Sequence, residues 1–266
     1  MAMEFENELN KAIDAIKLAG AEVINIYNSN YEVNIKGDKS PVTKADLTSE
    51  KIIIKELKNF GYGFVAEESG VTDTKSNFYW VIDPLDGTKD FIQKTGDFSI
   101  MIGLLRNKEP VLGVVYAPAI DKLWYAIKNN GAYCISKGKK WKINVSDEVD
   151  LKKFRLVISR FHFRQEDKDV ADRLGITSFE KMGSVGIKYS RIAEGDAELC
   201  VYTTGFLGLW DCCAPHIILK EAGGYLMDIN GDEPGYNFST LKMDKGFIGT
   251  NGKNIKDVME SIKKIE

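Results

Sequence analysis

The chain is poor in the residues that build disulfide scaffolds and zinc sites. Its 266 residues include four cysteines, none in a CxxC spacing, and two histidines, His162 and His216. A zinc site is therefore disfavoured, because structural zinc usually takes four closely spaced Cys or His ligands. Scattered thiols of this kind are typical of reducing compartments, so we expect a cytoplasmic protein.

Basic charge and long apolar runs are also lacking. The formal net charge of −3 offers no basic surface to a nucleic-acid polymer or an anionic membrane. No apolar stretch approaches the roughly 20 residues that a membrane-spanning helix needs. The N-terminus, MAMEFENELNKAID, is acidic and unlike a secretory signal peptide. We therefore expect neither nucleic acid nor membrane as a partner.

The composition is that of a globular protein with a substantial core. Hydrophobic residues make up 44% of the chain and charged residues 28%. The length exceeds that of a typical single domain, which favours one large domain or two that pack closely. A lysine-rich connector at Lys137–Lys140 marks a change in composition. We place a boundary there, with an N-terminal α+β part at 1–140 and a C-terminal α/β part at 141–266.

Hydrophobic periodicity predicts helices and strands that alternate along the chain. In the first part, two helices precede a run of strands: helices 4–27 and 43–59, then strands 78–83, 98–105, 111–116, 123–127 and 132–135. In the second part the two types alternate: strands 156–159, 179–182, 199–202, 225–229 and 246–249, with helices 165–174, 187–193, 211–221 and 254–264. Thr43 and Asp46 fit a capping box at the start of the second helix. This order predicts a layered α/β (α+β) architecture.

The stretch WVIDPLDGT, which ends at Thr88, places two carboxylates at the end of a predicted buried strand. Its DPLD segment, from Asp83 to Asp86, fits a β-turn, which would hold its end Cα atoms within about 7 Å. Two carboxylates about 5 Å apart repel by about 3 kcal/mol at an effective dielectric constant near 20. Both stay ionised at low cost only with a cation between them. A structural interpretation remains open, in which Asp83 caps the turn and Asp86 caps the following helix.

Gly87 and Thr88 open a short predicted helix, whose free N–H groups form a site for an anion. Carboxylates beside such groups suit a divalent metal together with a phosphate, and oxygen ligands favour magnesium or manganese over zinc. Two further acidic residues could complete the site: Glu67 in AEESG and Asp211 in the WD pair. Each has a structural alternative, an exposed surface pair for Glu67 and a helix N-cap for Asp211.

Taken in chain order, these segments resemble the inositol monophosphatase superfamily of magnesium-dependent, lithium-sensitive phosphatases. The matching segments are SPVTKAD with Asp46, AEES with Glu67, DPLDGT from Asp83 to Thr88, and WDCCAPHIILKEAGG with Asp211. The motifs lie in family order and span most of the chain. The resemblance implies a layered αβαβα sandwich and a metal-dependent phosphoric monoester hydrolase.

The resemblance also implies roles for individual residues. The implied metal ligands are Glu67, Asp83, the carbonyl of Leu85, Asp86 and Asp211, for two or three Mg²⁺ ions that Mn²⁺ can replace. The implied catalytic residues are Asp46, Glu67 and Thr88. Thr88, paired with Asp46, would orient the attacking water, and the N–H groups of Gly87 and Thr88 would hold the phosphate. A metal ion supports such chemistry because it promotes deprotonation of water and stabilises a departing oxygen.

Within the superfamily, the chain looks closest to the 3′(2′),5′-bisphosphate nucleotidases. Its DPLDGTKDF resembles their DPLDGTK followed by Glu and an aromatic residue, with Asp90 in place of that Glu, whereas inositol phosphatases usually carry DPIDGTTNF. Thr204 stands where inositol phosphatases carry a glutamate that binds the inositol ring. The segment SRFH resembles the nucleotidase S-R-S-H, and SVGIK contains a matching Ser and Lys. The implied substrate-binding residues are therefore Ser159, His162, Ser184 and Lys188.

We therefore expect an enzyme that hydrolyses 3′-phosphoadenosine 5′-phosphate to AMP and phosphate, by attack of a metal-activated water. Two alternatives remain open: inositol 1-phosphate or fructose 1,6-bisphosphate as substrate on the same scaffold, and a non-catalytic protein that binds an anion or a metal. Each of two substrate residues keeps a structural alternative, a solvated helix lysine for Lys188 and simply a loop residue for His162. The expected partner is a small phosphorylated substrate, and the resemblance suggests a homodimer.

Overall fold

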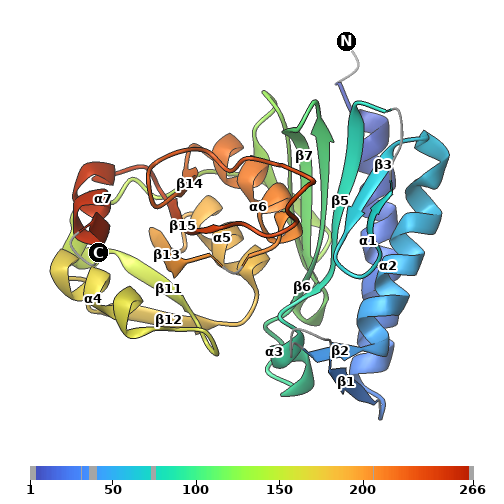
Figure 1. The fold of residues 1–266 in the computed structure, drawn as a ribbon, viewed down its shortest axis with the longest axis horizontal. Helices are drawn as coiled ribbons and strands as arrows, with labels where there is room; N and C mark the ends of the chain where they lie inside the picture. Colours follow the sequence, from blue (N-terminus) through green and yellow to red (C-terminus); the bar gives the residue numbers. More distant parts are fainter. Residues whose placement is uncertain (1–3, 31, 36–40, 73–75, 206, 264–266) are drawn as a thin grey trace.

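The computed structural model describes residues 4–30, 32–35, 41–72, 76–205 and 207–263. Figure 1 shows five layers, in which three pairs of helices alternate with two sheets. The helices that form these pairs are α1 (Glu6–Tyr27) with α2 (Lys44–Leu57), α5 (Val185–Ala193) with α6 (Leu209–Glu221), and α4 (Gln165–Leu174) with α7 (Ile255–Lys263). This is the αβαβα sandwich that the resemblance predicts.

The first sheet has eight strands in the order β10-β9-β8-β7-β6-β5-β3-β4. Their bounds are β3 (Gly63–Ala66), β4 (Gly70–Thr72), β5 (Phe78–Asp86), β6 (Ser99–Arg106), β7 (Glu109–Ala117), β8 (Lys122–Ile127), β9 (Ala132–Ser136) and β10 (Lys139–Ile143). All neighbours are antiparallel except β3 and β5, which are parallel. Periodicity did not predict the edge strands β4 and β10. A short hairpin, β1 (Val33–Ile35) and β2 (Pro41–Thr43), forms a separate two-stranded sheet.

The second sheet has five strands in the order β12-β11-β13-β15-β14. Their bounds are β11 (Arg155–Ser159), β12 (Ser178–Met182), β13 (Leu199–Thr204), β14 (Tyr225–Asp228) and β15 (Lys245–Thr250). A short helix, α3 (Thr88–Ile92), follows β5. Three 3₁₀ turns complete the described elements: η1 (Lys58–Phe60), η2 (Pro118–Ile120) and η3 (Leu151–Lys153). Strand β10, at the edge of the first sheet, ends at Ile143, and the expected boundary at 140/141 lies within this strand.

The first sheet is buried on both faces, and β6 illustrates how. Ile100, Ile102 and Leu104 join the core beneath α1 and α2. Met101 and Leu105 join the core beneath α5 and α6. Successive side chains of a strand point to opposite faces, so a run of apolar residues serves both helix layers.

Two glycines in this sheet allow α6 to approach it closely. A Cβ atom on Gly103 would lie 2.4 Å from Cys213 Sγ, and one on Gly113 would lie 2.5 Å from the Ala214 carbonyl oxygen. Helix α6 is therefore held directly against β6 and β7, which fixes the position of Asp211 in its first turn.

All four cysteines are buried and free. Within the described residues, no helix has the length and apolar character needed to cross a membrane.

The predicted capping box of α2 is confirmed. The Thr43 hydroxyl accepts a hydrogen bond from the Ala45 N–H, and Asp46 Oδ2 accepts one from the Thr43 N–H at 2.7 Å. Helix α6 begins at Leu209, two residues before the predicted start at Asp211. Its N-cap is Gly208, so the interpretation of Asp211 as the N-cap is wrong. Asp211 instead accepts the Gly208 N–H at 2.6 Å from within the first turn.

Candidate metal centre

The predicted β-turn at Asp83–Asp86 is wrong, because β5 continues through both residues. Asp83 pairs with Met101 and Asp86 with Ser99, so β5 contains one more residue than β6 between these pairs. Such a β-bulge changes the direction of side chains. In a regular strand, residues three apart point to opposite faces. The bulge brings both carboxylates to one side, and Asp83 Oδ1 accepts the Leu85 N–H at 3.0 Å across it.

Asp211 joins these two aspartates from α6. One carboxylate oxygen of each lies within 4.8 Å of the others, although Asp83 is only 1% exposed and Asp86 only 7%. At this separation each pair of charges repels by about 3 kcal/mol. Burial, followed by the charges of Glu67, Asp86 and Asp211, raises the pKa of Asp83 well above its usual value. Burial and the charges of Asp86 and Glu67 do the same for the pKa of Asp211.

Glu67 reaches this cluster from the strand next to β5. Its N–H donates to the Ile82 carbonyl at 3.2 Å, which extends the parallel pairing of β3 and β5 and puts Glu67 beside Asp83. The residue is half-buried rather than part of an exposed surface pair. Its charge contributes to the raised pKa of both Asp83 and Asp211. Glu67 therefore acts electrostatically on the cluster.

Asp86 is held in one orientation by three donors. Its Oδ2 atom accepts hydrogen bonds from the Ser184 hydroxyl, the Gly186 N–H at 2.7 Å and the Ser99 hydroxyl at 3.3 Å. Asp86 thus caps the start of α5 and not, as the structural interpretation had it, the start of α3, whose N-cap is Gly87. Burial raises the pKa of Asp86, while the Lys188 charge and the hydrogen bonds from Ser184 and Gly186 act in the opposite direction.

Asp46 and Thr88 meet at the edge of the cluster. The Thr88 hydroxyl lies 3.2 Å from both Asp46 Oδ1 and the Leu85 carbonyl oxygen. Asp46 Oδ2 accepts hydrogen bonds from the N–H and the hydroxyl of Thr43, both at 2.7 Å. Burial raises the pKa of Asp46 to about 6, against the effect of the Thr43 donors and with a smaller contribution from the Glu68 charge. This carboxyl can therefore exchange a proton near neutral pH.

Gly87 occupies a position that only glycine fits. Its φ of +89° lies in the left-handed region, and a Cβ atom there would lie 2.9 Å from the Asp97 carbonyl oxygen. The residue turns the chain from β5 into α3, so that Thr88 begins the helix. The N–H groups of the first helical turn have no acceptor within the helix and are available to an anion.

Two of the predicted substrate residues lie at the end of β11. The Ser159 hydroxyl accepts the His162 N–H at 3.0 Å, which shapes the turn between β11 and α4. His162 Nε2 lies 3.3 Å from Lys89 Nζ, and Lys89 directly follows Thr88 on α3. Desolvation and the charge of Lys89 lower the pKa of His162. His162 lies in the turn after β11, as a loop residue would, and its ring contacts α3 of the first part of the chain.

The other two predicted substrate residues lie beneath the cluster. Ser184 is completely buried and bonded to Asp86. Lys188 is also completely buried, so the interpretation of a solvated lysine is wrong. Its Nζ donates to the carbonyls of Met182 at 3.2 Å and Gly183 at 2.9 Å. The charge of Lys188 acts on Asp86 from beneath the cluster. The SVGIK segment did not predict this position.

Two residues that organise the site were not among the predicted site residues, although Arg160 lies within the SRFH segment. Ser99 lies on the strand opposite the bulge and was read only as part of β6. Arg160 donates from Nε to Asp90 Oδ1 at 2.9 Å and also pairs with Asp97. This arginine ties β11 to α3 and to the segment before β6. Such cross-chain contacts cannot be read from local spacing.

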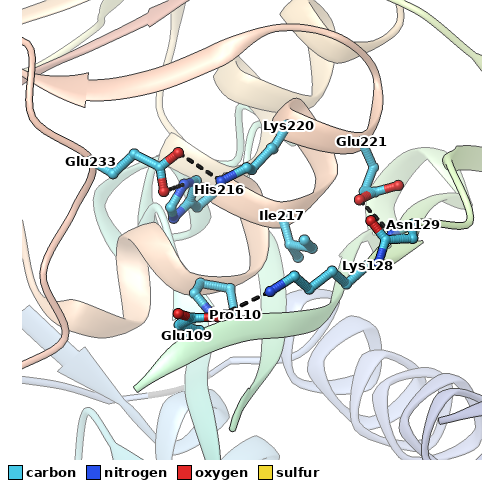
Figure 2. Close-up of a pocket in the computed structure, with 9 residues that line it drawn as sticks. All are labelled: Glu109, Pro110, Lys128, Asn129, His216, Ile217, Lys220, Glu221 and Glu233. Carbon is cyan, nitrogen blue, oxygen red and sulfur yellow. Dashed lines mark hydrogen bonds and ion pairs between the residues drawn. The ribbon is translucent and has the colours of Figure 1, made fainter. Parts of the chain in front are cut away.

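A cavity of about 280 Å³ lies at the opposite end of α6 (Figure 2). Its charged side chains pair with one another, Lys128 with Glu109 at 2.9 Å and Lys220 with Glu233 at 2.6 Å. Lys220 follows Asp211 by nine residues, about 14 Å along the helix. The cavity is thus separate from the acidic cluster.

The donor set of the cluster fits a hard divalent cation. Asp83, Asp86 and Asp211 offer converging carboxylate oxygens, with Asp83 and Asp86 buried and Asp211 half-buried, and Glu67 adds a further negative charge. Oxygen ligands of this kind suit Mg²⁺, Mn²⁺ or Ca²⁺. The cluster could therefore bind a metal, whose positive charge would offset the repulsion among the carboxylates.

Residues 5–265 match the family model described as the inositol monophosphatase family. With this fold and acidic site, the chain is a phosphatase and thus a hydrolase. It belongs to the inositol monophosphatase family.

Individual relatives agree with this placement. The chain is 35% identical over 241 residues to a "3′(2′),5′-bisphosphate nucleotidase CysQ" of Buchnera aphidicola, covering 87% of this chain and 88% of that one. It is 33% identical over 234 residues to a "Fructose-1,6-bisphosphatase/inositol-1-monophosphatase" of Aquifex aeolicus, covering 81% and 85%. Among solved structures, an IMPase of Thermotoga maritima superposes with a TM-score of 0.83 at 27% identity, covering 97% and 98%.

The electrostatics of the cluster predict a pH-dependent and metal-dependent stability. The pKa values of Asp83, Asp86 and Asp211 are raised in the folded state. The folded protein therefore keeps protons that the unfolded chain has released, and stability falls as pH rises from about 4. In EDTA we expect a lower melting temperature at pH 7.5 than at pH 5.5. At about 100 times its Kd, Mg²⁺ should raise the value at pH 7.5 by about 5–10 °C.

The Asp83→Asn variant separates repulsion from metal binding. In EDTA at pH 7.5 it should be at least as stable as the wild type, because one buried charge is gone, yet Mg²⁺ should stabilise it by less than about 2 °C. Asp172→Asn, on the exposed face of α4, is the control and should keep the full shift. Equal stabilisation of wild type and Asp83→Asn by Mg²⁺ would refute the assignment.

Proposed function

We propose that this phosphatase is a magnesium-dependent 3′(2′),5′-bisphosphate nucleotidase, which hydrolyses 3′-phosphoadenosine 5′-phosphate to AMP and phosphate. The observation that carries the proposal is the convergence of Asp83, Asp86 and Asp211 beside the Thr88–Asp46 pair. Relatives named as CysQ nucleotidases, 30–35% identical over most of the chain, support this choice of substrate.

The residues that would hold the metal ions, two or three Mg²⁺ with Mn²⁺ as a substitute, are Glu67, Asp83, the Leu85 carbonyl, Asp86 and Asp211. Bound there, a divalent cation supplies charge neutralisation at the phosphate and lowers the pKa of water. The protein's own contribution is to fix the oxygens. The bulge orients Asp83, and the donors from Ser184 and Gly186 orient Asp86.

Thr88 and Asp46 form a path for the proton of the attacking water. The Thr88 hydroxyl can accept that proton as it passes its own to Asp46 Oδ1, 3.2 Å away. A pKa near 6 leaves Asp46 ionised at neutral pH and ready to accept it. The N–H groups of Gly87 and Thr88, at the start of α3, hold the phosphate in line with the water.

His162 and Lys89 form the side of the site that would recognise the second phosphate. Lys89 adds a positive charge beside Thr88, and His162 lies within 3.3 Å of it, on the turn that Ser159 shapes. Ser184 and Lys188 lie beneath the cluster and support the site indirectly. Ser184 donates a hydrogen bond to Asp86, and Lys188 donates to the carbonyls of Met182 and Gly183. Thr204 carries no charge for an inositol ring, which favours the nucleotide substrate.

A second candidate keeps the chemistry and changes the substrate. The Aquifex relative is named for fructose 1,6-bisphosphate and inositol 1-phosphate, and it is 33% identical to this chain. The metal and phosphate residues would serve these substrates equally, because they contact only the reacting phosphate.

Phosphate release from three substrates tests the proposal. With Mg²⁺ we expect kcat/KM for adenosine 3′,5′-bisphosphate to exceed that for inositol 1-phosphate and fructose 1,6-bisphosphate by at least about a hundredfold. Inositol 1-phosphate lacks a second phosphate, and we expect Lys89 and His162 to recognise the second phosphate where the ribose of the nucleotide places it. EDTA should abolish release, and Li⁺ should inhibit it. A preference for inositol 1-phosphate would support the second candidate, and no release from any substrate would indicate a binding protein.

The acidic limb of the pH profile should report Asp46. Below pH of about 6 this carboxyl is protonated and cannot accept the proton, so kcat/KM should fall tenfold per pH unit. Asp46→Asn should lower the rate by about 10²–10⁴-fold and remove this limb from the residual activity. Its Mg²⁺-induced melting shift should remain, because Asp46 is not among the ligands. A residual rate with an unchanged limb would contradict the role.

His162→Ala should separate substrate recognition from chemistry. We expect KM for adenosine 3′,5′-bisphosphate to rise about tenfold, the cost of one hydrogen bond to a charged group. Turnover of an aryl phosphate, which lacks the second phosphate, should change less than about twofold. Lys168→Ala on the exposed face of α4 is the control. If both substrates lose activity equally, His162 acts on the reaction and not on recognition.

A further inference from the structure

Helix α2 carries a second buried acidic residue that the chemistry above does not use. Glu50 follows Asp46 by one turn of α2, and its side chain is only 5% exposed. Residues four apart lie on the same face of a helix. Helix α2 therefore presents two buried carboxylates toward the site, and only that of Asp46 has a role in the proton path.

The partners of Glu50 are backbone and hydroxyl donors of a single turn. Its Oε2 atom accepts the Glu68 N–H at 2.9 Å. The N–H and the hydroxyl of Ser69 also donate to its carboxylate. This turn leaves β3 after Ala66 and returns as β4, with Ala66 paired to Gly70. One carboxylate thus fixes the tight reversal that begins with Glu67.

The position of this reversal matters for the cluster. Glu67 is anchored on one side by its N–H bond to the Ile82 carbonyl, one residue before Asp83. On the other side, the next peptide is anchored by Glu50. The charge of Glu67 raises the pKa of both Asp83 and Asp211, so Glu67 lies close to them. A shift of the turn would move this acidic group out of the site.

Burial of a carboxylate at this place is costly unless its charge serves a purpose. The Glu68 charge lies close enough to oppose ionisation of Glu50. An apolar residue or an amide would fill the same volume without that penalty, but neither would accept several donors as strongly as a carboxylate does. The Glu50 carboxylate therefore stabilises the turn through stronger hydrogen bonds than either replacement would make.

We propose that Glu50 is a positioning residue, which holds the Glu67 turn against β5 so that the metal site is complete. The inference rests on the proposed function, in which Glu67 is a metal ligand. Glu50 itself lies outside the group of converging carboxylates found among the described residues. It acts through the Glu68 peptide, in the way that partners behind metal ligands tune affinity.

The test measures metal binding without substrate. Glu50→Gln keeps the shape of the side chain and weakens its hold on the donors. In thermal melts against MgCl₂, and separately MnCl₂, we expect the half-saturating concentration to rise about tenfold or more. At saturating Mg²⁺, kcat should return to within about threefold of the wild type. Glu56→Gln, on the same helix but paired with Lys11 at 2.7 Å, is the control and should bind metal as the wild type does.

A double-mutant cycle distinguishes positioning from a general structural role. In a Glu67→Gln background, Glu50→Gln should weaken Mg²⁺ binding by less than about twofold, because the ligand it positions is already gone. Additive losses would overturn the inference, and so would a folded Glu50→Gln protein with unchanged metal affinity. If Glu50→Gln does not fold, the same cycle with Glu50→Asp, whose shorter side chain withdraws from the donors, has the same expected and overturning results.

The proposed function can fail separately. A wild type that binds Mg²⁺ but releases no phosphate would refute the nucleotidase proposal, while a tenfold weaker affinity in Glu50→Gln would still support positioning.

Discussion

Mutual repulsion among buried carboxylates is the constraint on which the rest of this structure depends. Asp83, Asp86 and Asp211 approach within 4.8 Å, with Glu67 nearby, in a place where water screens little. Each charge raises the cost of ionising its neighbours, so the folded chain alone holds the cluster under strain. A divalent cation bound there would offset this repulsion, and an anionic ester could then approach the acidic site.

Contacts within the fold hold the acidic side chains in place against their mutual repulsion. The bulge in β5 turns Asp83 and Asp86 to one side, and α5 binds Asp86 through its first turn. Glycines at 103 and 113 seat α6 on the sheet, which sets Asp211. Both glycines and the bulge lie in the same layer of strands, so the rigidity of this sheet is what defines the geometry of the centre.

Both parts of the chain supply residues to the site. The first part carries Asp46 on α2 and Thr88 on α3, the pair that we propose acts on the reacting phosphate. The second part supplies Asp211 and, through the turn after β11, His162. Arg160 joins the parts by binding Asp90 and Asp97. Relatives that match most of this chain carry different substrate names, one a 3′(2′),5′-bisphosphate nucleotidase and another a fructose-1,6-bisphosphatase/inositol-1-monophosphatase.

The sequence alone determined the order of elements, the capping box of Thr43 and Asp46, and the acidic residue types, because periodicity and capping act within a few positions. It predicted a β-turn at Asp83 that the structure does not contain, missed the edge strands, and left open a solvated Lys188. Only tertiary structure decided these, since a bulge needs its partner strand and burial needs the layers on either side. Distances between carboxylates from β5 and α6 belong to the packed molecule, because no local rule brings together residues more than a hundred positions apart.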